Sequence, residues 1–229
     1  MPDAPHSPLR TYGRIKSRPI KPRQAALMET LLPAIRAPQQ PFEPRALMPA
    51  ARAVWLEIGF GGGEHMAAQA ARHPDVLMLG AEPFQNGVAS ALRHIDEQAL
   101  GNVRIQDGDA RELISRLPDA AVERVFILFP DPWPKTRHHK RRFVSPENLE
   151  QLARVLKDGV EFRFGTDHMD YCRWTLAHLM DHPDFEWTAE GPGDWRRRPA
   201  DWPPTRYESK AAEKGLKSAY LTFRRRKRA

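Results

Sequence analysis

The segment Ala53-Val54-Trp55-Leu56-Glu57-Ile58-Gly59-Phe60-Gly61-Gly62-Gly63-Glu64 sets the fold class of this 229-residue chain. Its first half is a run of mostly apolar residues, which is typical of a strand buried on both faces of a parallel sheet. Four glycines within five positions follow, and a helical pattern begins at Glu64. A buried strand, a glycine-rich turn and a helix in this order indicate an open α/β sheet, which binds ligands where its strands end.

Strand and helix patterns alternate along the rest of the chain. Strands are expected at Ala53–Ile58, Val76–Ala81, Val103–Gln106, Val125–Phe129 and Val160–Phe164, and helices at Glu64–Arg72, Phe84–Ala99, Asp109–Arg116 and Ser145–Leu156. The turn Lys157-Asp158-Gly159 should end the last of these helices. A helix up to Met180, a strand at Phe185–Ala189, a loop from Gly191 to Pro204 and a strand at Ala219–Phe223 complete the chain. This alternation predicts an α/β fold with a doubly wound parallel sheet.

The composition changes near residue 50. Residues 1–50 contain ten of the 22 prolines, and eight Lys or Arg against three acids. We expect one helix there, at about Gln24–Ile35, within a basic arm that is otherwise extended and partly disordered. Residues 51–223 are long enough for one α/β domain with a large core, and residues 224–229 form a basic tail.

The whole chain carries 36 Lys and Arg against 29 Asp and Glu, a formal net charge of +7. This excess favours a polyanionic partner. The one cysteine, Cys172, excludes an intramolecular disulfide, and we expect its thiol to be a small buried group. No CxxC or HExxH motif is present to indicate zinc, so we expect no metal. No apolar run is long enough to cross a membrane and no secretory signal opens the chain, which predicts a soluble cytoplasmic protein.

The glycine-rich turn differs from a dinucleotide-binding turn. The motif GxGxxG, counted from Gly59 and Gly61, would need glycine at position 64, where this chain has Glu64. An acidic side chain at the start of the helix would repel a pyrophosphate. Glycines at this turn still allow a ligand to approach the backbone closely. The turn therefore favours a nucleoside-like ligand without a phosphate.

Carboxylates stand at the ends of the first three expected strands. Glu57 at the first strand can lie near a cationic amine, and Glu82 after the second can accept hydrogen bonds from both hydroxyls of a ribose. Asp109 after the third can accept from the amino group of adenine. Each acid alone could be a solvated loop residue, but three at consecutive strand ends favour one shared site. A ribose, an adenine and an ammonium group describe S-adenosylmethionine better than NAD.

A second unusual stretch is Phe129-Pro130-Asp131-Pro132-Trp133-Pro134-Lys135-Thr136-Arg137-His138-His139-Lys140-Arg141-Arg142. Three prolines stiffen the loop around Asp131, which follows a buried strand at the ligand-binding edge of the sheet. Five Lys or Arg and two His then fall within eight positions, as contact with a phosphate backbone requires. Trp133 could stack on a base or cover the core, and both interpretations stay open.

Five short motifs mark the expected strand ends and loops. They are Glu57-Ile58-Gly59-Phe60-Gly61, Gly80-Ala81-Glu82-Pro83, Phe129-Pro130-Asp131-Pro132-Trp133-Pro134-Lys135, Gly165-Thr166-Asp167 and Thr205-Arg206-Tyr207-Glu208. Together they resemble the tRNA (guanine-N7-)-methyltransferase family of bacteria, and the likeness extends from Tyr12-Gly13-Arg14 to Phe223. Departures are mild: Thr136 stands where a second Lys is frequent, and Arg206 where Lys and Arg vary.

This resemblance implies a Rossmann-like class I methyltransferase fold, with a doubly wound, mostly parallel seven-stranded sheet and helices on both faces. It implies methylation of guanine N7 in the variable loop of tRNA, usually position 46, with S-adenosylmethionine as cofactor. It also assigns roles: cofactor binding to Glu57, Gly59, Gly61, Glu82, Asp109 and Asp131, catalysis to Asp131, substrate binding to Lys135, Asp167, Thr205, Arg206, Tyr207 and Glu208, and RNA binding to Arg137, His138, His139, Lys140, Arg141 and Arg142. Whether the protein is a monomer or a homodimer stays open.

The chemistry agrees with these residue types. Guanine N7 carries a free lone pair, so its methylation needs alignment and stabilisation of a cationic purine rather than a general base. Asp131, Asp167 and Glu208 can accept hydrogen bonds from the Watson–Crick edge of guanine, and Thr205 can donate or accept one. Asp167 could also cap the helix that follows it.

Two other functions are weighed against this one. A non-catalytic RNA-binding protein on a methyltransferase fold would not need the acids Glu57, Glu82, Asp109 and Asp131. An enzyme that methylates a protein or a small molecule would not need the basic run or the basic arms. Methylation of RNA explains both sets of residues.

Overall fold

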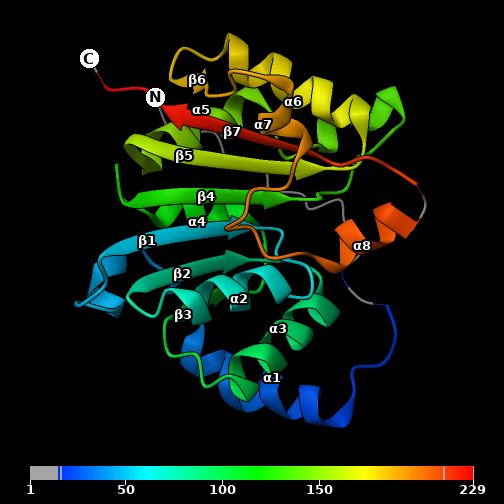
Figure 1. Ribbon diagram of the computed structural model, residues 1–229. Coiled ribbons are helices and arrows are strands. Elements are labelled where there is room, and N and C mark those ends of the chain that lie inside the picture. Colours follow the sequence, from blue (N-terminus) through cyan, green and yellow to red (C-terminus); the bar gives the residue numbers. More distant parts are fainter. Residues whose placement is uncertain (1–14, 16, 214, 229) are drawn as a thin grey trace, which may run out of the picture.

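The computed structural model describes residue 15, residues 17–213 and residues 215–228. Within this part, seven strands form one sheet with the order β3-β2-β1-β4-β5-β7-β6 (Figure 1). The strands β1 to β5 pair in parallel, whereas β7 runs antiparallel to β5 and β6. The bounds are Ala53–Ile58 for β1, Val76–Ala81 for β2, Val103–Gln106 for β3, Val122–Leu128 for β4, Leu156–Thr166 for β5, Phe185–Trp187 for β6 and Ala219–Arg225 for β7.

Helices cover both faces of this sheet (Figure 1). The helices are α1 (Pro22–Ile35), α2 (Glu64–Arg72), α3 (Gln85–Glu97), α4 (Ala110–Arg116), α5 (Pro146–Val155), α6 (Met169–Asp181), α7 (Pro192–Arg196) and α8 (Arg206–Glu213), with 3-10 helices η1 (Pro44–Leu47) and η2 (Thr136–Arg141). Buried side chains of α4, α5 and α6 share one core cluster, and those of α1, α2 and α3 share the other. The predicted doubly wound α/β fold is confirmed, with an antiparallel strand inserted between β5 and β6.

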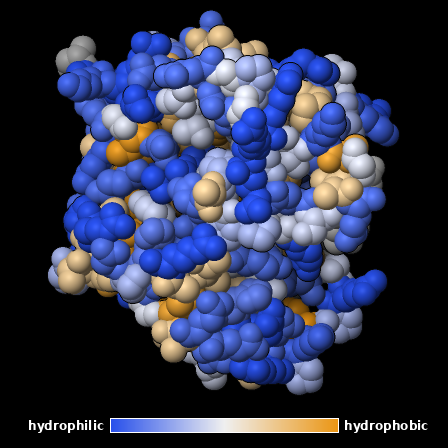
Figure 2. All heavy atoms as spheres, in the orientation of Figure 1, coloured by the Kyte–Doolittle hydropathy of each residue, from blue (hydrophilic) through white to orange (hydrophobic). Residues whose placement is uncertain are grey.

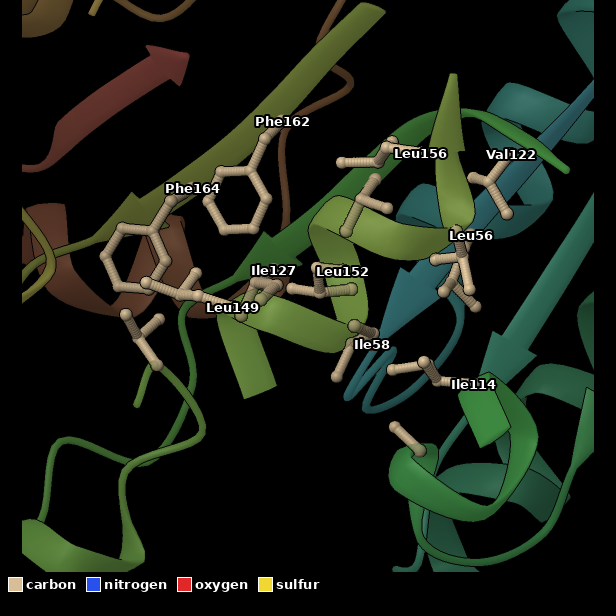
Figure 3. Packing of buried hydrophobic residues seen from close by; sticks show 14 of the residues in the cluster. Leu56, Ile58, Ile114, Val122, Ile127, Leu149, Leu152, Leu156, Phe162 and Phe164 are labelled. Carbon is tan, nitrogen blue, oxygen red and sulfur yellow. The ribbon is translucent and has the colours of Figure 1, made fainter. Parts of the chain in front are cut away.

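Strand β1 shows why its sequence reads as a continuous apolar run. Leu56 and Ile58 belong to the cluster under α4 and α5, whereas Trp55 packs in the cluster under α2. Figure 3 shows Leu149 and Leu152 of α5 beside the strand residues of the first cluster. Burial of each large apolar side chain stabilises the fold by roughly 1.5–3 kcal/mol. Hydrophilic residues cover most of the face seen in Figure 2, which agrees with the burial of large apolar side chains inside the protein.

The predicted bounds agree with the structure where the pattern is strongest. Strands β1, β2 and β3 and helix α2 begin and end as predicted. Strand β4 ends one residue earlier than predicted, because Phe129 adopts φ 52°, a left-handed value that a strand does not accommodate. The prediction that Lys157–Gly159 forms a turn after α5 is wrong, since these residues lie within β5.

Four short helices were not predicted, and the first of them, η1, lies in the arm that was expected to be extended. The expected loop from Gly191 to Pro204 contains α7, and η2 lies within the basic run. Helix α8 begins at Arg206, where Thr205 accepts a hydrogen bond from the amide of Glu208 at 3.1 Å and so caps the helix. Short helices rich in Pro and Arg have no clear apolar periodicity, and tertiary contacts decide them.

The described part of residues 1–50 packs on the domain. The predicted helix near Gln24–Ile35 is confirmed as α1, whose Leu32 and Ile35 are buried. Arg23 pairs with Asp96 of α3 at 3.0 Å, which fixes α1 beside α3. Residues 1–14 and 16, which include Tyr12–Arg14, lie outside the described residues. The domain boundary at residue 50 stays a prediction.

Two arginines near the C-terminus form ion pairs and hydrogen bonds with the rest of the domain. Arg225 is buried in β7, and its Nη2 lies 3.2 Å from Oδ1 of Asp184. Arg228 donates to the carbonyls of Ala153 and Leu156, at 2.9 Å and 2.7 Å, and pairs with Asp158. These carbonyls lie at the C-terminal end of α5, where a cation is favourable. The described tail residues therefore contribute to the fold. No helix in the described ranges is both long and apolar enough to span a bilayer.

Asn102 supplies a test of the amino-terminal edge of the sheet. Its buried amide donates to the carbonyls of Ala70, His73 and Val76 at 2.9–3.1 Å, which joins the end of α2 to the start of β2. Asn102→Leu should lower the free energy of unfolding by about 3 kcal/mol, because it removes the buried donor that these carbonyls share. Of the three, the carbonyl of His73 keeps a second donor, the amide of Val76. Urea unfolding followed by tryptophan fluorescence measures the change. A loss below about 0.5 kcal/mol would contradict this role.

Candidate active site

A pocket of about 880 Å³ opens at the carboxyl ends of β1, β2 and β4. Its walls come from the turns after β1, β2 and β3, from the loop after β4 and from the start of α5. Gly59 and Gly61 line it with φ values of +70° and +55°. Glycine adopts such angles without strain, and no atom lies within 4 Å of the space that a Cβ at Gly59 would fill. The backbone of this turn is therefore open to a ligand.

Glu82 lies directly after β2 on the pocket wall. The amide of Gly61 donates to its Oε2 at 2.7 Å, and the amide of Phe84 donates to its Oε1 at 2.8 Å. Burial is the main cause that raises the pKa of Glu82 to about 7; the two amides oppose this rise, and the charges of Asp131 and Glu57 add to it. Each oxygen keeps a second lone pair, so Glu82 can still accept from two hydroxyls.

Glu57 lies behind the pocket wall. Its side chain is 2% exposed, and Nδ1 of His65 on α2 donates to its Oε2 at 2.7 Å. Ile58 and Gly59, the next two residues, do line the pocket. The effect of Glu57 on the pKa of Glu82 shows that its charge is felt at the site. The sequence predicted this acid but gave no sign of its partner His65.

Asp109 reaches the pocket from the start of α4. It caps this helix by accepting from the amide of Arg111 at 2.9 Å, and its two oxygens also bind the guanidinium of Arg111. Arg111 lines the pocket as well, which the sequence did not predict. Its planar fork fixes the plane of the Asp109 carboxylate. Oδ2 of Asp109, which accepts from Nη2 of Arg111, has a second lone pair for an exocyclic amine.

Asp131 lines the pocket on the loop after β4 and is exposed. Phe129 and Trp133, which flank it two residues away on each side, have φ values of +52° and +44°. Such left-handed angles in aromatic residues are strained, and strain of this kind concentrates at functional sites. Prolines on either side of Asp131 reduce its freedom further. The loop thus holds one carboxylate in a fixed place beside Glu82.

The residues expected to hold substrate lie around α8 and after β5. Oε1 of Glu208 accepts from the hydroxyl of Tyr220 and lies 3.1 Å from Nε of Arg198, while its Oε2 is buried without a hydrogen-bond partner in the described part of the chain. Nε of Arg206 lies 3.8 Å from Oε1 of Glu64, so it reaches the start of α2. The side chain of Tyr207 lies outside what the structure describes.

Asp167 and Lys135 were also expected to bind substrate and lie on two other segments. Asp167 is half-buried after β5, and the residue that caps α6 is His168, so Asp167 does not have the capping role considered above. Lys135 is exposed just before η2. Neither residue lines the pocket.

The basic run forms η2 beside the pocket. Lys140 and Arg141 line the pocket, and the guanidinium of Arg141 lies 4.8 Å from the ring centre of Trp133. Arg137 is exposed, and His138 and His139 are half-buried. Arg142 differs from its expected role, because its side chain is 1% exposed and binds the carbonyl of Pro132 and Asp170. Arg142 also lines the pocket, but its guanidinium anchors the loop through these two bonds.

The pocket extends further than the predicted residues. Its far wall is formed by the start of α5 and by α6, with Phe143, Ser145, Pro146, Glu147, Asn148, Trp174 and His178. No spacing in the sequence joins α6 to the strand-end acids, so only the packing of α6 could reveal this wall. Cys172 of α6 is buried as expected, and burial raises the pKa of its thiol.

One group of three possible metal ligands occurs among the described residues: Glu150, His182 and Asp184. The amide of Asp184 donates to Nδ1 of His182 at 3.2 Å, which leaves the proton on Nε2, the atom that faces Glu150. Arg225 binds Asp184. An N–H donor and a guanidinium do not suit a metal site, so we interpret the group as polar contacts that include the Arg225–Asp184 ion pair.

Comparison with known proteins agrees with this geometry. The model of a family described as putative methyltransferases matches residues 51–221. A tRNA (guanine-N(7)-)-methyltransferase of Caulobacter sp. strain K31 is 60% identical over 209 residues, which cover 91% of this chain and 92% of that protein. One of Rhodospirillum rubrum is 50% identical over 236 residues, covering 100% of this chain and 92% of that protein. The chain belongs to the tRNA (guanine-N(7)-)-methyltransferase family.

Solved structures agree on the fold alone. The 16S rRNA methyltransferase KamB superimposes with a TM-score of 0.54 at 15% identity and covers 80% of this chain and 92% of its own. A SAM-dependent O-methyltransferase from Thermotoga maritima gives a TM-score of 0.51 at 16% identity, covering 93% and 68%. The fold is therefore the Rossmann-like class I methyltransferase fold, as the resemblance implied.

The family uses S-adenosylmethionine, and the pocket fits this cofactor. Burial and two neighbouring carboxylates disfavour the charge on Glu82, and a cationic ligand would relieve this repulsion. The open turn at Gly59 can receive the ligand without steric conflict. The donor groups of the ligand and the acceptors of the pocket are complementary, and no phosphate needs to be neutralised.

The raised pKa of Glu82 predicts how cofactor affinity depends on pH. Because ribose hydroxyls donate to the ionised carboxylate, protonation of Glu82 below pH 7 should compete with binding. The affinity for S-adenosylhomocysteine should fall about tenfold from pH 7.5 to pH 6. Isothermal titration measures it. Glu82→Gln should bind more weakly with no such decrease, which separates the titration of Glu82 from that of the α-amino group of the ligand. Parallel pH curves for both proteins would exclude Glu82 as the titrating group.

Proposed function

We propose that this protein transfers the methyl group of S-adenosylmethionine to N7 of a guanine in the variable loop of tRNA. The observation that carries the proposal is a pocket lined by Glu82 and Asp131, with Glu57 buried behind its wall, beside an exposed basic loop. The first feature suits a cationic nucleoside cofactor, and the second suits RNA. The names of the family's members agree with both.

The cofactor, when bound, supplies an electrophilic methyl group on a sulfonium. N7 of guanine attacks with its own lone pair, so no residue has to remove a proton. We assign to Asp131 the stabilisation of the cationic purine as it forms, since its carboxylate lies on the pocket wall in a loop held by strained backbone. Glu82 and Asp109 would hold the ribose and the adenine, and Glu57 would lie near the ammonium group.

The guanine would be held by its Watson–Crick edge. The buried Oε2 of Glu208 has no partner within the described residues, which makes it a candidate acceptor for N1–H and the exocyclic amine. Asp167 and Thr205 would complete this grip, with Lys135, Arg206 and Tyr207 at the rim. A base in folded tRNA must leave its stack to reach this place.

The basic loop would hold the RNA backbone. Lys135, Arg137 and Lys140 are exposed around η2, which makes them the strongest candidates for phosphate contacts. His138, His139 and Arg141 would support them, and we leave Arg142 out because it is buried. Trp133 is half-buried with Arg141 against its ring, so stacking on a base and covering the loop both stay open. We place the protein in the cytoplasm, where tRNA is found in bacteria.

Mapping of the modified base tests the function. A tRNA transcript with guanine in the variable loop is incubated with protein and labelled S-adenosylmethionine, and strand cleavage specific for 7-methylguanosine locates the product. A transcript with adenine at that position is the control. Label in another base, in the protein fraction or in neither fraction would contradict the proposal.

Asp131→Asn tests the reaction centre. The change keeps the shape of the side chain but removes the charge that would stabilise the cationic purine. Turnover should fall at least about a hundredfold, on the order of 3 kcal/mol of transition-state stabilisation, while tRNA affinity changes far less. Single-turnover kinetics measures the effect. Asp119→Asn, at the opposite edge of the sheet where Asp119 pairs with Arg154, should keep full activity. Comparable rates for both variants would remove Asp131 from the mechanism.

Replacement of Lys135, Arg137 and Lys140 by Ala tests the basic loop. If the three side chains contact three phosphates, the slope of log affinity for tRNA against log salt should become shallower by about two to three. Filter binding at several salt concentrations measures this slope, and cofactor affinity should not change. The control replaces Arg52, Arg72 and Lys157, which lie near the amino ends of the strands. Equal slopes for the wild type and the loop variant would place the RNA elsewhere.

A further inference from the structure

Two buried polar residues of α2 have no part in the chemistry described above. His65 is 2% exposed and Gln69 is 1% exposed. They lie one turn apart on the face of α2 that packs on the sheet, next to Met66, a residue of the apolar core. Buried polar side chains are costly unless they are fully hydrogen-bonded, so their presence calls for a structural reason.

These residues form a continuous chain of hydrogen bonds between two distant parts of the sequence. Nδ1 of His65 lies 2.7 Å from Oε2 of Glu57, the acid at the end of β1. Nε2 of His65 lies 3.2 Å from Nε2 of Gln69, and the same nitrogen of Gln69 lies 2.8 Å from the carbonyl oxygen of Asp201. The chain therefore joins the cofactor side of the pocket to the segment between α7 and α8.

The direction of each hydrogen bond follows from Asp201. Its backbone carbonyl can only accept, so the amide of Gln69 must present its NH₂ group there rather than its oxygen. The second N–H of that group then points to Nε2 of His65, which must carry a lone pair. His65 is consequently the Nδ1–H tautomer and donates to Glu57. The Glu57 carboxylate can only accept, so it requires the same tautomer, and the chain from Asp201 to Glu57 holds Gln69 and the His65 ring in one orientation.

The segment that supplies this carbonyl leads directly to the proposed guanine contacts. It crosses in front of the sheet between α7 and α8 (Figure 1). Nη1 of Arg163 donates to Oδ2 of Asp201 at 2.7 Å. Trp202 is buried and packs closely against Gly165: a Cβ atom built at Gly165 would lie only 3.3 Å from the indole of Trp202. Three residues later, Thr205 caps α8, which carries Glu208.

We propose that His65 and Gln69 are positioning residues that couple the cofactor site to the guanine-binding segment. When residues 201–205 are seated, the Asp201 carbonyl orients Gln69, and His65 then holds Glu57 for the cofactor. When the segment moves away, the amide of Gln69 loses its acceptor, and Nε2 of His65 loses the donor that holds the ring in place. Two sites that bias one element in this way must affect each other's affinity equally. The inference rests on the proposed function, because it takes Glu57 and α8 as the two ligand sites.

The coupling is measured as a ratio of affinities. Isothermal titration gives the affinity of the wild type for S-adenosylhomocysteine without tRNA and with saturating tRNA. We expect tRNA to tighten this binding about fivefold to tenfold, the effect of about one hydrogen bond. Gln69→Met keeps the size of the side chain and removes both donors. In this variant, the ratio of the affinities for S-adenosylhomocysteine with and without tRNA should fall to about one. The KM for tRNA should rise, while kcat changes less.

Asn102→Leu is the matched control. Asn102 is also a buried amide with several hydrogen bonds, but it lies at the amino-terminal edge of the sheet, away from the pocket. It should lose stability and keep the wild-type ratio. His65→Asn is the second variant, because the Asn amide can replace Nδ1–H toward Glu57 but cannot reach Gln69. It should keep the cofactor affinity of the free protein and lose the coupling.

A spectroscopic readout separates positioning from simple stabilisation. In ¹⁵N NMR spectra of labelled histidine, Nε2 of His65 should show the shift of a nitrogen that accepts a hydrogen bond in the wild type and in Asn102→Leu, and of one that accepts none in Gln69→Met. A wild-type ratio of one, or an unchanged ratio in both Gln69→Met and His65→Asn, would overturn the coupling. A failure of the proposed function would appear differently, as wild-type protein that does not methylate tRNA.

Discussion

The burial of one carboxylate, Glu82, at the carboxyl edge of the sheet is the constraint on which this site depends. Parallel strands bring Glu57 and Asp131 to the same edge, where their charges add to the effect of burial and raise the pKa of Glu82. The amides of Gly61 and Phe84 offset part of this cost by donating to Glu82. The pocket therefore binds most favourably a cationic ligand that carries hydroxyl and amine donors. The preference for S-adenosylmethionine over a phosphate-bearing cofactor follows from this balance.

The rest of the site consists of segments held against this edge. Asp131 is fixed by prolines and by the left-handed backbone of Phe129 and Trp133. The basic loop is fixed by Arg142, which turns a residue of the basic run inward to bind the Pro132 carbonyl and Asp170. The exposed cations of η2 therefore start from a defined position. Rigid placement lowers the entropy cost of binding a large, flexible RNA.

Buried polar side chains place the loops of this protein. Gln69 and Arg163 hold the segment that begins at Asp201, and Asn102 joins α2 to the amino-terminal edge of the sheet. Each of these groups is directional, whereas apolar packing alone would allow a loop to slide. The carboxyl-terminal Arg225 and Arg228 act in the same way on the end of α5. Specific placement, more than added stability, is the physical reason for such groups.

The sequence by itself determined the sheet and the acids at its edge. Strands such as Ala53–Ile58 and Val76–Ala81 are buried on both faces. Their continuous run of mostly apolar residues therefore predicts a buried strand from local sequence alone. The strand-end positions of Glu82 and Asp109 followed from those runs. Only tertiary structure decided that Arg142 turns inward, that Arg111 binds Asp109, and that Asp201 meets Gln69, 132 positions away in the chain. The spacing of polar side chains in the sequence does not predict their partners, because a hydrogen bond depends on where the folded chain brings its two atoms.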